Sequence, residues 1–486
     1  MSRKKALNGF KWTTIANLSH YAISFALSII LARYLTPREY GITASFAIFT
    51  IFSRTLIDGG LSVALVQKKE INQGHLNSVF WFNLMMSLLL YFLVWIIAPS
   101  LSNFLREDEL TPIIRIVSIV YITNALGLVQ NSLLIRELNF RKQTVINILS
   151  LSISVLVALY CIYKNMGVYC IVFQILSQSI VLNLLLTISS NWRPRFYFLT
   201  KSFGDLWNLG SRVLVVNLVN SIYNQLDGFF IGRVFRLNLL GIYTRGKSFT
   251  DMINSIYVNS IQTVTFSLLS ESKNESSDDK FLHQHKMIFS FALFYLIILC
   301  AIISTNSENI VAILYGEKWL DSSFYLSWLI FGLIPVFIST MSSQSLLAKG
   351  EGKVYLKLFL FRKTPIFISF FVGYYYGLTS FVIFGVIFNI LLIIIDFYFL
   401  SSFLKIPIYY YLKKTLLFLV FIPVLFAVSL MVRQLIPYQM YLELIITVLT
   451  QLTFLVLILE LLKLKEYGEM KKIIFKKLRF DKNINW

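Results

Sequence analysis

The sequence predicts an all-α integral membrane protein with about fourteen transmembrane helices, arranged as two six-helix lobes followed by two additional helices. Three observations predict this class. The 486 residues are 57% hydrophobic, with a mean hydropathy of +0.71. Only 14% of them are charged, whereas a soluble domain carries about 25% charged residues. Apolar runs of about 20 residues, the length that crosses a bilayer as a helix, recur along the whole chain.

The apolar runs are separated by short polar breaks. They are too long for the strands of a β-barrel and do not alternate apolar with polar residues. The count falls to twelve or thirteen if the charged stretch around Arg362 and Lys363 is not part of a span. The expected spans are 10–31, 41–63, 76–98, 112–134, 144–163, 167–188, 208–231, 241–268, 287–307, 323–347, 358–377, 380–400, 415–434 and 441–462.

The composition and motifs exclude several classes of protein. The chain has only three cysteines, all in or beside apolar segments, which excludes a disulfide-built scaffold and a cysteine-based zinc site. It has no Walker motif, which excludes ATP hydrolysis of that type. The first apolar run lacks an Ala-x-Ala cleavage site, so we expect it to be retained. No loop is long enough to resemble a folded domain.

The basic residues predict the orientation in the membrane. With a cytoplasmic N-terminus, 29 Lys and Arg residues face the cytoplasm, 8 face outward and 7 fall inside the spans. This bias matches the positive-inside rule, so the net charge of +20 reflects topology and not nucleic-acid binding. We therefore expect both termini in the cytoplasm, with a basic tail over 463–486 beside anionic lipid.

Residues 1–70 and 201–270 match at a constant offset of 200. Both copies begin on the same side of the membrane, so they are parallel repeats related by an axis along the membrane normal. The matches include Asn17-Leu18 with Asn217-Leu218, Arg33 with Arg233, and Gly41-Ile42 with Gly241-Ile242. The expected domains are an N-lobe over 1–200, a C-lobe over 201–400, an additional helix pair over 401–462 and the tail over 463–486.

The repeat separates shared residues from those present in one half. Arg33 and Gly41 recur at the outer turn of a helical hairpin, where a turn glycine and an interfacial arginine are explained by the fold. Arg54 and Asp58 have no counterpart in the second copy; they lie four residues apart on one helix face and can pair. The two alternatives for them, a self-satisfied pair and a cavity-lining role, stay open.

Charges in the spans need a cavity or a partner, because an ionisable group in mid-bilayer costs at least about 2.5 kcal/mol. Asp227 should lie at the depth of Arg245 and Lys247, which leaves a surplus of positive charge. Arg212 lies near the inner end of its span. Asp251 lies one to two turns further in than Arg245.

Four stretches resemble the polysaccharide exporters of the multidrug/oligosaccharidyl-lipid/polysaccharide (MOP) flippase superfamily, and in particular the lipopolysaccharide, O-antigen, colanic-acid and teichuronic-acid exporters. The resemblance is close over the first 70 residues, and the span layout and repeat extend it over the chain. The stretches are Gly9-Phe10-Lys11-Trp12, the turn from Ala32 to Gly41, Asp58-Gly59-Gly60-Leu61 and Ala64-Leu65-Val66-Gln67.

The resemblance implies a function. It implies two lobes facing each other, with alternating access moving an undecaprenyl-diphosphate-linked oligosaccharide from the inner to the outer leaflet of the bacterial plasma membrane. It implies a transporter and not an enzyme, and we expect no cofactor or metal. The titratable residues in the spans leave H⁺ or Na⁺ as the candidate coupling ion. A polysaccharide polymerase and a chain-length regulator are the expected protein partners of a monomer in membrane lipid.

The candidate site residues follow from the substrate's chemistry. Arg and Lys suit the phosphate oxygens, whereas amide and hydroxyl groups suit the glycan, although intramembrane Asn and Tyr also hold helices together. The candidates are Arg54, Arg212, Arg245, Lys247, Asn17, Asn217, Tyr223 and Asn224. The ion-coupling candidates are Asp58, Asp227, Asp251 and His20, the last of which has a structural alternative.

Two other functions compete with the flippase hypothesis. A cation-coupled drug or metabolite antiporter of the same superfamily would need an acidic cavity, whereas the candidate charges are mildly basic. A membrane enzyme, such as a glycan polymerase or ligase, would need a long outer loop. A peptidoglycan-precursor flippase is a close variant of the first hypothesis, and the turn motif favours the polysaccharide branch.

Overall fold

The computed structural model describes residues 3–258, 261–262, 265, 278–349, 351–435, 440–462 and 468. Over these ranges the chain is helical, without a strand. Eleven of the described helices are long and apolar enough to cross a membrane. The predicted all-α membrane class is therefore confirmed, while the count of fourteen spans stays a prediction. The predicted basic tail lies outside the described residues, apart from position 468.

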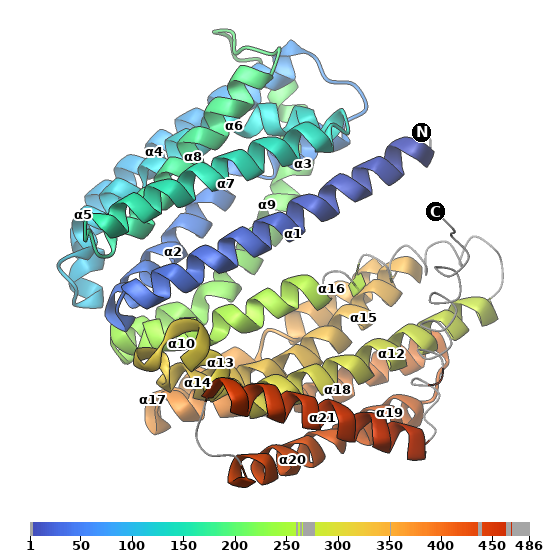
Figure 1. Ribbon diagram of the computed structural model, residues 1–486. Helices are drawn as coiled ribbons and strands as arrows, with labels where there is room; N and C mark the ends of the chain where they lie inside the picture. Colours follow the sequence, from blue (N-terminus) through green and yellow to red (C-terminus); the bar gives the residue numbers. More distant parts are fainter. Residues whose placement is uncertain are drawn as a thin grey trace, which may run out of the picture. The chain divides into compact units, whose positions relative to one another are not determined.

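The chain divides into two compact units, Met1–Thr244 and Arg245–Trp486, which we describe separately. In unit 1, α7 packs against α1 and α8, α6 packs against α4 and α8, and α9 packs against α2 and α3 (Figure 1). The helices that begin in this unit are α1 (Arg3–Tyr34), α2 (Pro37–Asp58), α3 (Leu61–Gln67), α4 (Gln73–Leu105), α5 (Leu110–Val117), α6 (Ile119–Arg136), α7 (Phe140–Tyr163), α8 (Tyr169–Ser189), α9 (Thr200–Val234) and α10 (Leu237–Ile253).

In unit 2, α18 packs against α15 and α17, and α12 packs against α15 and α20 (Figure 1). The last two helices, α20 and α21, pack against each other. The elements of this unit are η1 (Asn254–Val258), α12 (Asp278–Thr305), α13 (Ser307–Tyr315), η2 (Glu317–Trp319), α14 (Asp321–Leu329), η3 (Ile330–Gly332), α15 (Leu333–Lys349), α16 (Gly352–Phe361), α17 (Pro365–Tyr376), α18 (Leu378–Leu404), α19 (Ile408–Leu419), α20 (Phe421–Leu435) and α21 (Met440–Leu462).

Several predicted spans are interrupted, and three of them show how. The expected span over 41–63 ends at Asp58, because Gly59 and Gly60 adopt φ values of 57° and 69°, which no α-helix accommodates. The helix then restarts as α3. The expected span over 112–134 is divided at Ser118 into α5 and α6, and the one over 358–377 is divided between α16 and α17.

The turn between α1 and α2 is specified by a capping box. Thr36 accepts a hydrogen bond from the Glu39 backbone N–H, and the Glu39 carboxylate accepts one from the Thr36 N–H at 2.7 Å. Pro37 at the first helical position needs no hydrogen-bond partner for its nitrogen. The Thr-Pro-x-Glu sequence therefore begins α2 at a defined residue.

The helix bounds repeat at the offset that the sequence predicts. α1 ends at Tyr34 and α9 at Val234, while α2 begins at Pro37 and α10 at Leu237. The contacts repeat as well. A Cβ built on Gly41 would lie 1.7 Å from the Leu237 carbonyl oxygen, and one built on Gly241 would lie 1.8 Å from the Pro37 carbonyl oxygen. Each hairpin thus contacts the equivalent point of the other, as two related copies do.

The short helix α3 is held at its C-terminal end by two basic side chains. The Arg136 guanidinium on α6 donates to the carbonyl oxygens of residues 65, 66, 68 and 69. Lys68 Nζ lies 2.8 Å from Asp205 Oδ2 at the start of α9, and this hydrogen bond holds the pKa of Asp205 below its usual range. The segment after α3 is therefore fastened to α6 and α9.

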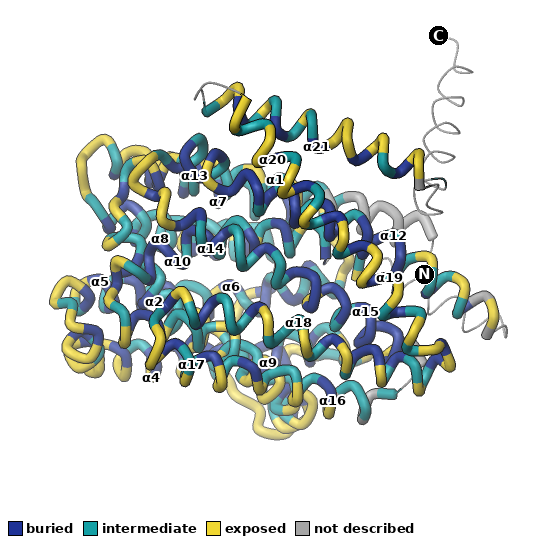
Figure 2. Tube along the Cα trace, turned by 90° about the horizontal axis from the view of Figure 1, so that it is seen from below, coloured by how far each residue is buried: buried dark blue, intermediate teal, exposed yellow. Residues whose placement is uncertain are grey.

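Large apolar side chains lie on the surface of many helices. On α4, Met85 and Ile96 are 68% and 69% exposed, whereas Val79 and Ala98 are fully buried. Figure 2 shows exposed positions recurring in this way along the helices. Such faces fit contact with lipid, since hydrocarbon chains give apolar side chains the environment that water denies them.

Candidate substrate-binding cavity

A cavity of about 680 Å³ lies inside unit 1. Its walls come from α2, α3, α6, α7, α8 and α9, which contribute twenty-one lining residues. A hydrogen bond of 2.9 Å between the hydroxyl groups of Thr55 and Ser221 joins α2 to α9 in this wall. The volume falls in the range of about 300–1,000 Å³ that small-molecule sites occupy.

Carboxamides dominate the polar lining of the cavity. Nine of the twenty-one lining residues are Asn or Gln. Five of them stand on α6, α7 and α8: Asn124, Asn131, Gln143, Asn147 and Asn183. The other four follow α9: Asn217, Asn220, Asn224 and Gln225.

Some of these carboxamides are held in place by their neighbours. The Asn124 side-chain oxygen accepts hydrogen bonds from the Ser179 hydroxyl at 2.8 Å and from the Asn183 amide at 3.3 Å. The Gln143 amide donates to the Asn131 side-chain oxygen at 2.9 Å. The orientations of these amides are therefore set before any ligand enters.

Arg54 and Asp58 are the charged residues among the cavity lining. Asp58 Oδ1 accepts the backbone N–H of Ser62 at 3.2 Å, at the start of α3. Arg54 is exposed and lines the cavity, and it forms no hydrogen bond or ion pair with a described residue. Arg54 and Asp58 both line the cavity and form no direct ion pair, and their role toward a substrate stays a prediction.

The other predicted residues of unit 1 are spread along α1 and α9. Asn217 and Asn224 line the cavity, whereas Arg212, Asn17 and His20 are exposed elsewhere and Tyr223 is half-buried. Arg212 contacts Asn208 one turn before it, at 3.5 Å.

The carboxylate of Asp227, a predicted ion-coupling residue, accepts two hydrogen bonds close to the end of α9. Its Oδ2 atom accepts a hydrogen bond from the Tyr243 hydroxyl at 2.7 Å, and its Oδ1 atom accepts the Gly228 backbone N–H at 2.8 Å. The carboxylate therefore ties α9 to the start of α10.

Three predicted residues belong to unit 2, on α10. Arg245 is 4% exposed, with its guanidinium 4.2 Å from the centre of the Tyr315 ring and 2.9 Å from the Ser248 hydroxyl. Lys247 is half-buried and Asp251 is exposed. Their predicted roles toward the diphosphate and the coupling ion stay predictions.

Sequence reasoning missed the carboxamides of α6, α7 and α8. It considered charges first and then the polar residues of the first and seventh spans. The signal that was available is the presence of Asn and Gln inside apolar runs, where each needs a hydrogen-bond partner. Spacing along separate helices did not show that these side chains share one cavity.

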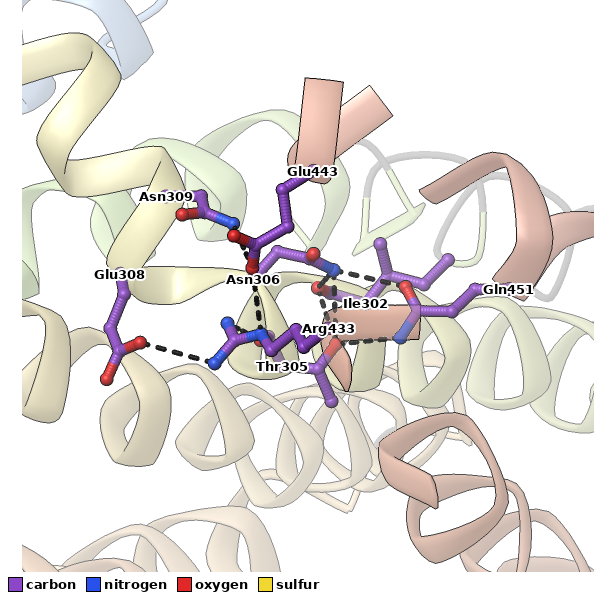
Figure 3. Close-up of polar contacts among 8 residues, drawn as sticks. All are labelled: Ile302, Thr305, Asn306, Glu308, Asn309, Arg433, Glu443 and Gln451. Atoms are coloured by element: carbon purple, nitrogen blue, oxygen red, sulfur yellow. Dashed lines mark hydrogen bonds and ion pairs between the residues drawn. The ribbon is translucent and has the colours of Figure 1, made fainter. Parts of the chain in front are cut away.

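Unit 2 contains a polar cluster near the end of α12 (Figure 3). Arg433 on α20 forms ion pairs with Glu308 on α13 at 3.2 Å and with Glu443 on α21 at 3.1 Å. The Asn309 amide donates to the Glu443 carboxylate, and the Gln451 amide donates to the Thr305 hydroxyl at 2.9 Å.

A second buried ion pair joins Arg362 to Asp396 on α18. Among the described residues, no group of three His, Cys, Asp or Glu side chains is placed to hold a metal ion.

A family of polysaccharide biosynthesis proteins matches residues 30–324, more than half of the chain. The chain belongs to this family. Individual relatives match a larger part of the chain. The teichuronic acid biosynthesis protein TuaB of Bacillus subtilis (strain 168) is 28% identical over 355 residues, which are 72% of each chain. The lipopolysaccharide biosynthesis protein WzxC of Escherichia coli (strain K12) is 22% identical over 324 residues, 65% of this chain and 64% of that one.

The succinoglycan biosynthesis transport protein ExoT of Rhizobium meliloti (strain 1021) is 26% identical over 266 residues, which are 55% of this chain and 54% of that one.

Solved structures show the same fold. The lipid II flippase MurJ in an inward closed conformation has a TM-score of 0.73 at 18% identity, covering 94% of this chain and 100% of that one. An inward-facing multidrug resistance MATE transporter of the MOP superfamily has a TM-score of 0.60 at 18% identity, covering 79% and 94%. The predicted membership of a polysaccharide biosynthesis family is confirmed, and the two solved structures share the fold of this chain.

Proposed function

We propose that this protein is a flippase that moves an undecaprenyl-diphosphate-linked oligosaccharide, the repeat unit of a surface polysaccharide, from the inner to the outer leaflet of the bacterial plasma membrane by alternating access. The family and the fold are those of membrane transporters of polysaccharide biosynthesis and not of enzymes. The relatives' names refer to three different polymers. The proposal therefore concerns lipid-linked oligosaccharides as a class.

The observation that carries the proposal is the cavity, lined by nine carboxamides and by Arg54, which forms no hydrogen bond or ion pair with a described residue. An oligosaccharide presents many hydroxyl groups, which carboxamides bind as donors and as acceptors. Arg54 adds a charge-assisted donor for the polar head. A cationic drug would instead need acidic groups, and the described lining contains one carboxylate, Asp58. The antiporter alternative is therefore less well supported.

Four further points belong to the same proposal. The lobes would follow the repeat, over 1–200 and 201–400, with the helix pair over 401–462 added to them. Both termini would lie in the cytoplasm, and the chain would act as a monomer that supplies a polymerase and a chain-length regulator. Asp58, Asp227, Asp251 and His20 would couple transport to H⁺ or Na⁺. Arg212, Arg245 and Lys247 would contact the diphosphate, and Asn17 and Tyr223 the glycan.

The test is transfer between leaflets. The purified protein is reconstituted into liposomes that carry a fluorescent undecaprenyl-diphosphate oligosaccharide in one leaflet, and arrival in the other leaflet is measured. We expect Arg54→Gln to slow transfer about tenfold or more, because a hydrogen bond to a charged group contributes about 1.5–3 kcal/mol. Arg54→Lys should retain part of the rate. Lys201→Gln is the matched control, since Lys201 is exposed at the start of α9 and outside the cavity.

Each outcome of this assay has one meaning. Transfer that survives Arg54→Gln keeps the flippase function and removes Arg54 from the site. An absence of transfer by the wild-type protein under every ion gradient, with glycans from the source cell's own pathway, contradicts the flippase function. A drug-coupled H⁺ or Na⁺ flux in the same liposomes would then establish the antiporter.

A further inference from the structure

Five carboxamides of the cavity have no side-chain hydrogen bond to any described residue. They are Asn147 on α7 and Asn217, Asn220, Asn224 and Gln225 on α9. None of the five is buried: Asn217 and Asn224 are exposed and the other three are half-buried, so a ligand in the cavity can reach their amide groups. These accessible amides, four on α9 and one on α7, can each donate and accept hydrogen bonds to a ligand in the cavity.

The other carboxamides of the lining offer a fixed pattern of donors and acceptors. The Asn124 oxygen already accepts two hydrogen bonds, so its NH₂ group is the part left to donate. In the Asn131–Gln143 pair, the Asn131 NH₂ group can still donate a hydrogen bond and the Gln143 oxygen can still accept one. Asn183 is set close to α6 because Gly127 has no side chain; a Cβ there would lie 1.9 Å from the Asn183 oxygen. Both kinds of hydrogen-bonding group are thus presented together.

The charge of the cavity lining indicates which part of a lipid-linked oligosaccharide, the sugar or the diphosphate, the cavity is suited to bind. A diphosphate requires several cationic groups around its oxygens. The lining holds one cation, Arg54, and a carboxylate four residues later on the same helix, Asp58. The formal charges cancel, so this wall is poorly suited to a diphosphate. Neutral groups that both donate and accept are suited to sugar hydroxyls.

We infer that the cavity inside unit 1 binds the sugar part of the lipid-linked substrate, that the carboxamides of α6, α7, α8 and α9 read its hydroxyl pattern, and that the diphosphate is bound outside this cavity. This inference rests on the proposed flippase function and names the part of the substrate that the site takes. Arg54 then donates to sugar oxygens.

The experiment separates the sugar from the diphosphate. The probes are the free oligosaccharide, released by mild acid from the cell's own lipid-linked precursor, and inorganic pyrophosphate. Binding of each to the full-length protein in detergent is measured by titration calorimetry. We expect the oligosaccharide to bind and pyrophosphate at the same concentration neither to bind in this cavity nor to compete. Flipping is measured in parallel in liposomes.

Asn147→Ala and Asn224→Ala are the informative variants, because neither side chain hydrogen-bonds to another described residue whose contact would be lost. Each should weaken oligosaccharide binding about threefold to tenfold, the worth of one ordinary hydrogen bond. Gln178→Ala is the matched control: it removes a carboxamide from α8 that contacts Gln174 and does not line the cavity. Its oligosaccharide affinity should equal that of the wild type.

A second readout locates the ligand. Asn224→Cys should react with a maleimide, and the free oligosaccharide should slow that reaction while pyrophosphate does not; the native cysteines are buried. If the wild type flips the lipid-linked substrate but neither variant changes oligosaccharide binding, the inference is wrong and the function stands. If pyrophosphate protects the cysteine, the inference is equally wrong. If the oligosaccharide binds at these residues without any flipping, the site stands and the flippase function fails.

Discussion

Gly41 and Gly241 allow a close helix contact because they have no side chain. Sequence reasoning explained them as turn glycines, but each is the fifth residue of a helix, α2 or α10, and has no positive φ. That explanation was wrong. The missing side chain lets the helix approach the carbonyl oxygen of Leu237 or Pro37, a contact that any Cβ would block.

Alanine at these positions tests the contact. We expect Gly41→Ala and Gly241→Ala each to destabilise the protein by about 1–3 kcal/mol, because the backbone of the facing turn cannot move aside as a flexible side chain would. Gly204→Ala is the control, since a Cβ there meets nothing within 4 Å on α9. It should be neutral or stabilising by about 0.4–1 kcal/mol. Thermal unfolding in detergent measures all three; equal midpoints would contradict the close contact.

The candidate site was partly predictable residue by residue. Arg54 and Asp58 could be named because a charge in an apolar span requires an explanation. Asn217 and Asn224 could be named from the repeat and from the polar content of their span. The α6, α7 and α8 carboxamides could not be assigned to one site, since each is a single uncharged residue and their convergence depends on how three helices are rotated.

At the scale of elements, the second unit shows how its last helices are fastened. Arg433 on α20 contacts α13 through Glu308 and α21 through Glu443, and its Nη2 atom donates to the Thr305 carbonyl oxygen at the end of α12 (Figure 3). The two carboxylates differ in exposure: the side chain of Glu308 is 63% exposed and that of Glu443 is 10% exposed. The same arginine therefore makes one exposed and one buried ion pair.

This difference predicts unequal costs for the same substitution. Glu443→Gln should destabilise the protein by about 1–3 kcal/mol, because it leaves the arginine charge without its buried counter-charge. Glu308→Gln should cost less than about 1 kcal/mol, since solvent screens an exposed pair. The midpoints of thermal unfolding in detergent provide the comparison. A larger loss for Glu308→Gln would show that α13, and not α21, is the element that Arg433 holds.

At the scale of the whole molecule, the loop residues that follow α7 and α8 allow a test of the protein's orientation in the membrane. Lys164 and Asn191 are both exposed and lie at opposite ends of this helix pair. The excess of basic residues predicts that the end bearing Lys164 faces outward and the end bearing Asn191 faces the cytoplasm.

Single cysteines decide the orientation. In intact cells, a membrane-impermeant maleimide should label Lys164→Cys and not Asn191→Cys, and permeabilisation should expose the second. The native Cys161, Cys170 and Cys300 are buried, so the wild type serves as the unlabelled control. The opposite labelling pattern would place the N-terminus outside and reverse the proposed topology.

The sequence by itself determined the membrane class, the approximate positions of most long helices and the repeat at an offset of 200. These depend on the length of apolar runs and on constant spacing, which are properties of the chain read in order. The tertiary structure decided which polar side chains meet. It joined carboxamides from α6, α7, α8 and α9 around Arg54 and placed Arg245 over Tyr315. Such encounters depend on the rotation of each helix about its axis, which packing sets and spacing along separate helices does not.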